Sequence, residues 1–242
     1  RAPIITYGIE QPADMRADQI ESKVDATTCR ITYRGETHRL ALPIAGLYNL
    51  SNALGALAAA VAAGFPLAEG ISRLATFPGV PGRMQRLEHD GGSSIFVDFA
   101  HTPEALSAVL TFLRGQTNGQ LIALFGCGGE RDADKRSKMG GIASRLADHV
   151  IITSDNPRSE HPDAICAEIA MGCSGSFEIE SDRRSAIAKG LSLLGSEDTL
   201  LIAGRGHELY QTIGNKCLLF DDAAVARELL EERKTGGAVS AS

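Results

Sequence analysis

The sequence predicts an α/β protein whose larger part is a mainly parallel sheet covered by helices on both faces. From about residue 95 onward, short apolar segments alternate with segments of helical period. The apolar segments are hydrophobic at nearly every position, which is typical of strands buried on both faces. We predict six such strands, over residues 95–99, 121–125, 150–153, 177–179, 199–203 and 217–220.

The clearest predicted helix follows the first of these strands. Thr102 is suited to the N-cap position and Pro103 to the first helical position. Apolar residues then recur at i, i+3, i+4 and i+7, namely at Leu106, Val109, Leu110 and Leu113. A second stripe over 139–146 precedes the next strand. Residues 223–234 are predicted to form a terminal helix, with a frayed tail from about residue 235.

The first part of the chain has a different pattern. Residues 1 to about 46 are predicted to form a short sheet region, with extended segments over 4–7, 29–33 and 39–42. An amphipathic helix follows from Asn49 and stops at Gly64, and a second helix follows Pro66.

A domain boundary is predicted at residues 77–83, where two prolines and two glycines fall within the seven residues "FPGVPGR". We therefore expect one domain over residues 1–82 and another over residues 83–242.

Composition excludes several classes of protein. The 242 residues are 43% hydrophobic, with a mean hydropathy of -0.04 and a formal charge of -6. A general nucleic-acid binder needs an excess of Lys and Arg, which this chain lacks. No apolar run approaches the roughly 20 residues of a membrane span, and no signal peptide is evident. The five cysteines have no metal-ligand spacing, so we expect reduced thiols and no metal site. We expect a cytoplasmic, monomeric protein and, because the chain begins at Arg1, a piece of a longer one.

Four of the predicted strands end in polar clusters. Their sequences are "FVDFAHTPEAL", "LFGCGGERDADKR", "TSDNPRSE" and "AGRGHE". In an open α/β sheet, ligands bind outside the carboxyl ends of the strands. We therefore expect the four clusters to lie along one edge of the sheet and to form a binding site.

The cluster after the second strand begins with Gly126, Gly128 and Gly129, which permit close approach of the backbone. Arg131 follows, within a run of charged residues that extends to Arg136. The alternative is a tight turn followed by a solvated charge run. A Walker phosphate-binding loop is excluded, because no Gly-Lys-Ser/Thr follows at the required spacing.

The cluster after the third strand contains Asp155, Asn156 and Arg158 around a turn-forming proline. The planar guanidinium of Arg158 suits a carboxylate, and Asp155 and Asn156 could bind an ammonium and a carboxylate together. The three residues therefore suit a zwitterion. The alternative is an Asx-type turn in which Arg158 pairs with Glu160 or Asp163.

The remaining two clusters supply further candidates. Gly204 and Glu208 follow a buried strand at a point where an amino group could be bound, and we assign no proton-transfer role to His207. Asp98 and His101 precede the capped helix. For Asp98 the alternative is that its carboxylate braces the turn.

Six motifs occur in the order and spacing found in the Mur ligases. They are "YNLSNALGALAAA", "GRM", "VDFAHTPEAL", "FGCGGERD", "SDNPRSEHP" and "AGRGHE". The sequence resembles this family over nearly its whole length. The resemblance implies a Rossmann-like C-terminal domain, preceded by the end of an α/β ATP-binding central domain. The Asp-Asn-Pro-Arg loop resembles that of members that add meso-diaminopimelate, whose second carboxylate Arg158 could hold.

The resemblance also implies roles for individual residues. Arg131, Asn156 and Arg158 would bind the distal, zwitterionic end of meso-diaminopimelate, and Gly204 and Glu208 the end whose amine attacks. Asp155 is expected among the residues that bind the same substrate. The residues expected on the ATP side are Asn49, Asn52, Arg83, Asp98 and His101. Glu130 and Arg205 stand where the family commonly has Asp and Lys.

The implied reaction is ATP-dependent amide formation through an acyl phosphate, with Mg²⁺ and a UDP-N-acetylmuramoyl-dipeptide as the second substrate. The phosphate-binding loop and the magnesium ligands of the family are not in this chain. We therefore expect no catalytic residue here and no activity of the piece alone. Two alternatives stay open: a stand-alone amino-acid-binding module, and a relative that adds lysine or glutamate.

Overall fold

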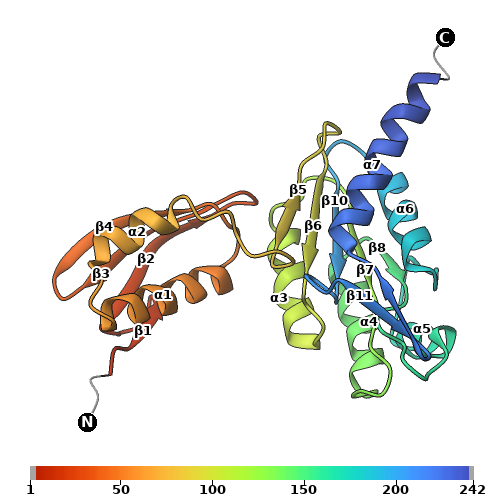
Figure 1. Cartoon of the computed structure of the whole chain (residues 1–242), viewed down its shortest axis with the longest axis horizontal. Helices are drawn as coiled ribbons and strands as arrows, with labels where there is room; N and C mark the ends of the chain where they lie inside the picture. Colours follow the sequence, from red (N-terminus) through yellow and green to blue (C-terminus); the bar gives the residue numbers. More distant parts are fainter. Residues whose placement is uncertain (1–3, 240–242) are drawn as a thin grey trace. The chain divides into compact units, whose positions relative to one another are not determined.

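The computed structural model describes residues 4–239, which form two compact units that meet in sequence between Gly79 and Val80 (Figure 1). This point lies within the Pro- and Gly-rich segment 77–83. No helix in the described part of the chain is long and apolar enough to cross a membrane.

The first unit is a four-stranded sheet with two helices packed against it. Its strands lie in the order β1-β2-β3-β4, and only the β1–β2 pair is parallel. The elements are β1 (Tyr7–Ile9), β2 (Met15–Ser22), β3 (Thr27–Tyr33), β4 (Glu36–Leu42), α1 (Leu47–Ala62) and α2 (Leu67–Leu74). Side chains from the sheet and both helices form one hydrophobic core. The sequence reading missed β2, because the strand contains polar residues and a register shift between Asp18 and Glu21.

The second unit is a six-stranded sheet in the order β5-β6-β10-β7-β8-β9. All neighbouring strands are parallel except β5 and β6, so the α/β class with a mainly parallel sheet is confirmed. The strands are β5 (Gln85–Leu87), β6 (Ser94–Asp98), β7 (Leu121–Phe125), β8 (His149–Ile152), β9 (Phe177–Ile179) and β10 (Thr199–Ala203).

Helices cover both faces of this sheet (Figure 1). One layer is formed by α3 (Pro103–Arg114), α4 (Lys135–Leu146) and α5 (Pro162–Ala170), and the other by α6 (Arg183–Leu193) and α7 (Asp222–Val239). The predicted N-cap is confirmed, because the Thr102 hydroxyl accepts a hydrogen bond from the backbone N–H of Ala105. The predicted stripe of α3 is buried against the sheet.

Two predictions at the C-terminal side need correction. The segment predicted as a sixth sheet strand is β12 (Lys216–Leu219), which pairs only with β11 (Tyr210–Ile213) in a separate antiparallel hairpin. All four residues of β12 are exposed, so its apolar character does not reflect burial. The terminal helix α7 continues to Val239, beyond the predicted start of the frayed tail. The rest of that tail, residues 240–242, lies outside the described residues.

The strand order brings four loops to one edge of the sheet. Strand β10 lies between β6 and β7, and β8 is next to β7. In register, Ala203 is opposite Asp98, and Phe125 is opposite Ile152, so these strands end at nearly the same level. The loops that follow them therefore start side by side, as expected of a binding edge in a parallel sheet.

Candidate functional site

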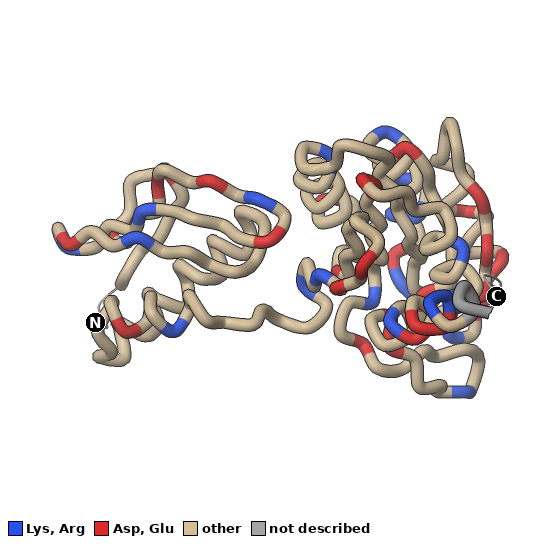
Figure 2. The backbone as a smooth tube through the Cα atoms, turned by 90° about the horizontal axis from the view of Figure 1, so that it is seen from above, with Lys and Arg blue, Asp and Glu red and all other residues tan. Residues whose placement is uncertain are grey.

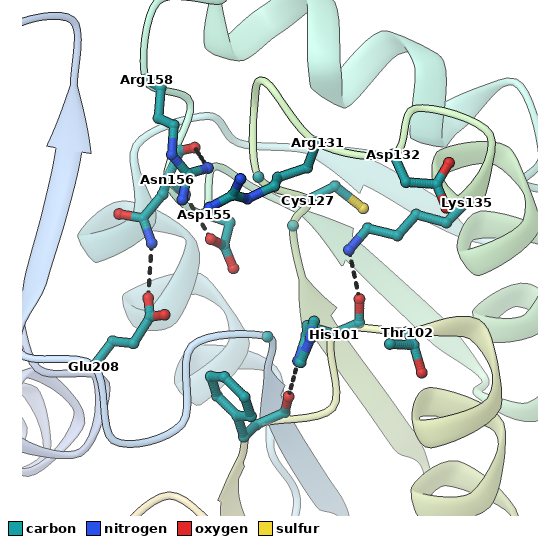
Figure 3. Close-up of a pocket in the computed structure, with 14 residues that line it drawn as sticks. His101, Thr102, Cys127, Arg131, Asp132, Lys135, Asp155, Asn156, Arg158 and Glu208 are labelled. Carbon is teal, nitrogen blue, oxygen red and sulfur yellow. Dashed lines mark hydrogen bonds between the residues drawn. The ribbon is translucent and has the colours of Figure 1, made fainter.

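A cavity of about 390 Å³ lies at this edge of the sheet (Figure 3). Loops that follow β6, β7, β8 and β10 line it. The predicted site residues that the structure brings together here are His101, Arg131, Asp155, Asn156, Arg158, Gly204 and Glu208. Of the other candidates, Arg83 and Asp98 belong to the same unit without lining the cavity, and Asn49 and Asn52 belong to the first unit.

The glycine-rich turn after β7 is needed because two loops cross there at close range. A Cβ atom on Gly126 would lie 2.2 Å from the carbonyl oxygen of Thr153, and one on Gly129 would lie 2.0 Å from that of Pro157. Real Cβ atoms do not approach other atoms so closely. Glycine at these two positions therefore lets the turn pack directly on the Asp-Asn-Pro-Arg loop.

Arg158 is fixed through both its backbone and its side chain. Its φ angle is +54°, in the left-handed region that residues other than glycine rarely adopt. Its backbone N–H donates to the Thr212 carbonyl at 3.0 Å, and its Nη1 donates to the Gly129 carbonyl at 2.7 Å. The alternative pairing with Glu160 or Asp163 does not occur, because Glu160 pairs with Arg136 and Asp163 with His161.

Asn156 joins the third and fourth loops. Its Oδ1 accepts from the Thr212 N–H at 2.8 Å, and its Nδ2 donates to Oε2 of Glu208 at 2.7 Å. Glu208 therefore lies beside Asn156 (Figure 3). The two side chains form one continuous wall of the cavity.

The cavity carries charges of both signs. Asp155 is buried, and its Oδ1 accepts the N–H of Asn156 at 2.6 Å. Arg131 is exposed at the rim. Along the backbone of both units, acidic and basic positions are interspersed (Figure 2). The site thus offers carboxylates and a guanidinium pair within one cavity, which matches a zwitterion.

Five side chains that line the cavity were not among the predicted site residues: Phe99, Thr102, Cys127, Asp132 and Lys135. Lys135 was read only as part of a charge run, whereas its Nζ lies at the cavity and donates to the carbonyl of His101 at 2.7 Å. The sequence signal that could have identified Lys135 is its position in the first turn of α4, shortly after the glycine-rich turn. Burial raises the pKa of Cys127 to about 12, so its thiol is not a ready nucleophile.

Arg83 and His101 both contact the ring of Phe99, the residue that follows β6. The Arg83 guanidinium lies 4.7 Å from the ring centre, and the His101 ring 4.5 Å from it. Asp98 braces this turn as the alternative predicted, since its two oxygens accept the N–H groups of Met84 and Ala100 at 2.7 and 2.8 Å. Burial outweighs these bonds and raises the pKa of Asp98.

In the first unit, Asn49 and Asn52 lie one turn apart on α1. Asn49 is buried, and its Nδ2 donates to the Ala45 carbonyl at 2.8 Å. Asn52 is exposed.

Comparison with known proteins places the chain in a family. Residues 82–206, more than half of the chain, match the model of the Mur ligase glutamate ligase domain, and residues 1–60 match the Mur ligase middle domain. The chain belongs to the Mur ligase family. Two curated Mur ligases, from Thermosynechococcus vestitus and Bacillus velezensis, are each 41% identical to it over 232 residues. Both are named UDP-N-acetylmuramoyl-L-alanyl-D-glutamate–2,6-diaminopimelate ligase.

These matches cover 94% and 96% of this chain but only 47% of each relative. The chain thus spans about half the length of the curated Mur ligases it matches. A solved structure of a ligase of the same name aligns with a TM-score of 0.66 at 35% identity, covering 95% of this chain and 48% of the other. A MurF ligase from Thermotoga maritima in complex with ADP shares the fold at 19% identity, with a TM-score of 0.65, over 95% of this chain and 49% of its own.

Proposed function

We propose that this chain is the amino-acid-binding part of a ligase that joins meso-diaminopimelate to UDP-N-acetylmuramoyl-L-alanyl-D-glutamate in peptidoglycan synthesis. The observation that most supports the proposal is the position of Arg158. Its guanidinium lines a cavity that is also lined by the carboxylates of Asp155 and Glu208 and by the amide of Asn156. The distal end of lysine carries only an ammonium group, whereas that of meso-diaminopimelate carries an ammonium and a carboxylate. An arginine here therefore favours meso-diaminopimelate.

In this proposal, the distal carboxylate of the ligand binds Arg158 and Arg131. Its distal ammonium binds Asp155 and Glu208, and Asn156 donates its second amide hydrogen to the carboxylate. Close packing of Gly204 supports this arrangement, since a Cβ atom there would lie 2.9 Å from Oδ2 of Asp155. Held in this way, the ligand is oriented so that its other amine attacks an acyl phosphate of the dipeptide, forming the amide as phosphate leaves.

A second group of residues is proposed to contact ATP. Arg83 and His101 lie against Phe99 at the edge of the sheet, and Asp98 fixes the segment that contains Arg83 through the N–H of Met84. Asn49 and Asn52 are the candidates for the adenine side. ATP would supply the phosphoryl group that activates the dipeptide carboxylate.

Magnesium is expected of such a ligase. Within residues 4–239, no three His, Cys, Asp or Glu side chains gather as a metal site would require. We therefore assign no magnesium ligand to this chain and derive no step through the metal.

Calorimetric titration tests the proposed specificity. The chain is expected to bind meso-diaminopimelate at least tenfold more tightly than L-lysine. Hydrogen bonds to charged groups contribute about 1.5–3 kcal/mol, so Arg158→Ala should weaken binding of meso-diaminopimelate roughly 10- to 150-fold and remove the preference. The matched control is Arg145→Ala, which removes an exposed arginine of α4 outside the cavity. Equal affinity for the two amino acids in the unmodified chain would contradict the proposal.

A further inference from the structure

Three charged side chains are buried directly beneath the proposed amino-acid site. Arg183 begins α6, Asp222 begins α7, and Arg205 lies in the loop after β10. All three side chains are 0% exposed. None of them is among the residues that line the cavity. A buried charge is costly unless it is compensated, so this cluster needs an explanation.

Arg183 and Asp222 form a two-bond ion pair. Arg183 Nε donates to Oδ1 of Asp222 at 2.8 Å, and Nη2 donates to Oδ2 at 2.7 Å. The same guanidinium donates to the carbonyls of Ser154 and Ala203, each at 3.0 Å. Ser154 immediately precedes Asp155, and Ala203 immediately precedes Gly204. The pair therefore ties together the two strand ends from which the site loops start.

Arg205 makes weaker contacts with its charged neighbours. Its Nη2 donates to the Phe220 carbonyl at 2.8 Å, while its Nε lies 3.7 Å from Oδ1 of Asp222 and, among the described residues, has no hydrogen-bond partner. Burial, together with the nearby Arg183 charge, lowers the pKa of Arg205. A salt bridge alone does not account for this buried arginine.

The remaining contacts of Arg205 are with the site itself. Its Nη1 donates to Oδ1 of Asn156 at 3.5 Å, and its Nη2 to the Glu208 carbonyl at 3.4 Å. With the Thr212 N–H also directed at Asn156 Oδ1, the amide is held with its Nδ2 toward Glu208. The charges of Asp155 and Glu208 in turn favour the charged form of Arg205.

We propose that Arg205 is a positioning residue of the amino-acid site, anchored by the Phe220 carbonyl beside the carboxylate of Asp222, and that it sets the orientation of Asn156 and Glu208. This inference rests on the amino-acid site proposed above. It extends that site by a residue that does not touch the ligand. The two contacts come from separate nitrogens of the guanidinium, Nη1 to Asn156 and Nη2 to Phe220, whereas lysine has one nitrogen, so lysine at this position would fulfil the role only in part.

The first test needs no ligand. In the NMR spectrum of the chain, the side-chain amide signals of Asn156 report its contact with Glu208. Arg205→Met removes the guanidinium group but keeps an unbranched side chain, so it should shift and broaden these signals. Arg205→Lys should perturb them less. Unchanged Asn156 signals in Arg205→Met would overturn the proposal. If Arg205→Met does not fold, Arg205→Lys is measured in its place. Unchanged Asn156 signals in Arg205→Lys would then overturn the proposal.

The second test is a double-mutant cycle with meso-diaminopimelate. Arg205→Met is expected to weaken binding about tenfold and Arg205→Lys less than threefold. If Arg205 acts through Asn156, Arg205→Met should cause little further loss in an Asn156→Ala background, whereas losses that multiply would contradict the proposal. The control is Arg184→Met, since Arg184 pairs with Glu228 and Glu232 at the surface. Failure of the unmodified chain to bind would refute the proposed function, and the NMR result would still decide the role of Arg205.

Discussion

At the scale of single residues, long-range contacts determine how the site side chains point. Asn156 is oriented by Thr212 and Glu208, which are 56 and 52 residues away in the sequence. The sequence identifies Asp155, Asn156 and Arg158 as a group because they are neighbours at a strand end. It does not show that Glu208 contacts Asn156 or that Lys135 turns toward the cavity, because both depend on how separate loops pack.

Asp18 in the first unit offers a test of residue-scale electrostatics. Its Oδ1 accepts from Nε of Arg30 at 2.6 Å, and its Oδ2 accepts from Nη2 of Arg16. The hydrogen bonds from Arg30 and then Arg16 lower the pKa of Asp18 to about 2, from 3.8. Because the folded-state pKa is lowered, the stabilisation is present above about pH 4 and is lost as the pH falls toward 2.

Two measurements check this prediction. The carboxyl ¹³C signal of Asp18 should titrate with a midpoint near 2, and a midpoint close to 3.8 would contradict it. In urea unfolding, Asp18→Asn should be less stable than the unmodified chain at pH 7. The difference between the two should shrink as the solution is acidified.

At the scale of elements, the site depends on how closely the loop after β7 packs on the loop after β8. Alternating apolar segments and capping signals were enough to predict strands β6 to β10 and helix α3. The hairpin of β11 and β12 was not predictable in the same way, because an apolar run does not reveal whether it is buried. Hairpin residues nevertheless matter, since the Thr212 carbonyl and N–H hold Arg158 and Asn156.

Gly129→Ala tests the packing of these two loops. The added methyl group would lie 2.0 Å from the Pro157 carbonyl oxygen, so one of the loops must move. We expect a loss of stability of about 1–3 kcal/mol in urea unfolding and at least a tenfold loss of affinity for meso-diaminopimelate. The control is Gly115→Ala at the end of α3, where φ is -70° and the nearest atom would be 3.6 Å away. That change should be neutral or slightly stabilising, and equal losses for both variants would contradict the account.

At the scale of the whole molecule, the two units have separate hydrophobic cores. Every residue that lines the cavity belongs to the unit from Val80 onward. The two units divide between Gly79 and Val80, within the segment 77–83 where the sequence pattern changes. The exact strand order was not visible, because the placement of β10 between β6 and β7 is set by contacts between distant segments.

A chain of residues 80–242 should therefore fold alone and bind meso-diaminopimelate as tightly as the 242-residue chain, within about twofold. Calorimetry on both chains, with circular dichroism to verify folding, makes the comparison. A folded shorter chain with much weaker binding would mean that the first unit contributes to the site.

The central claim is that the loops after β7, β8 and β10 select the distal zwitterion of meso-diaminopimelate. A crystal structure of the chain with this ligand tests it most directly. The account predicts the distal carboxylate within hydrogen-bond distance of Arg158 and the distal ammonium beside Asp155 and Glu208. A ligand bound with its distal carboxylate away from Arg158, or bound outside this cavity, would contradict it.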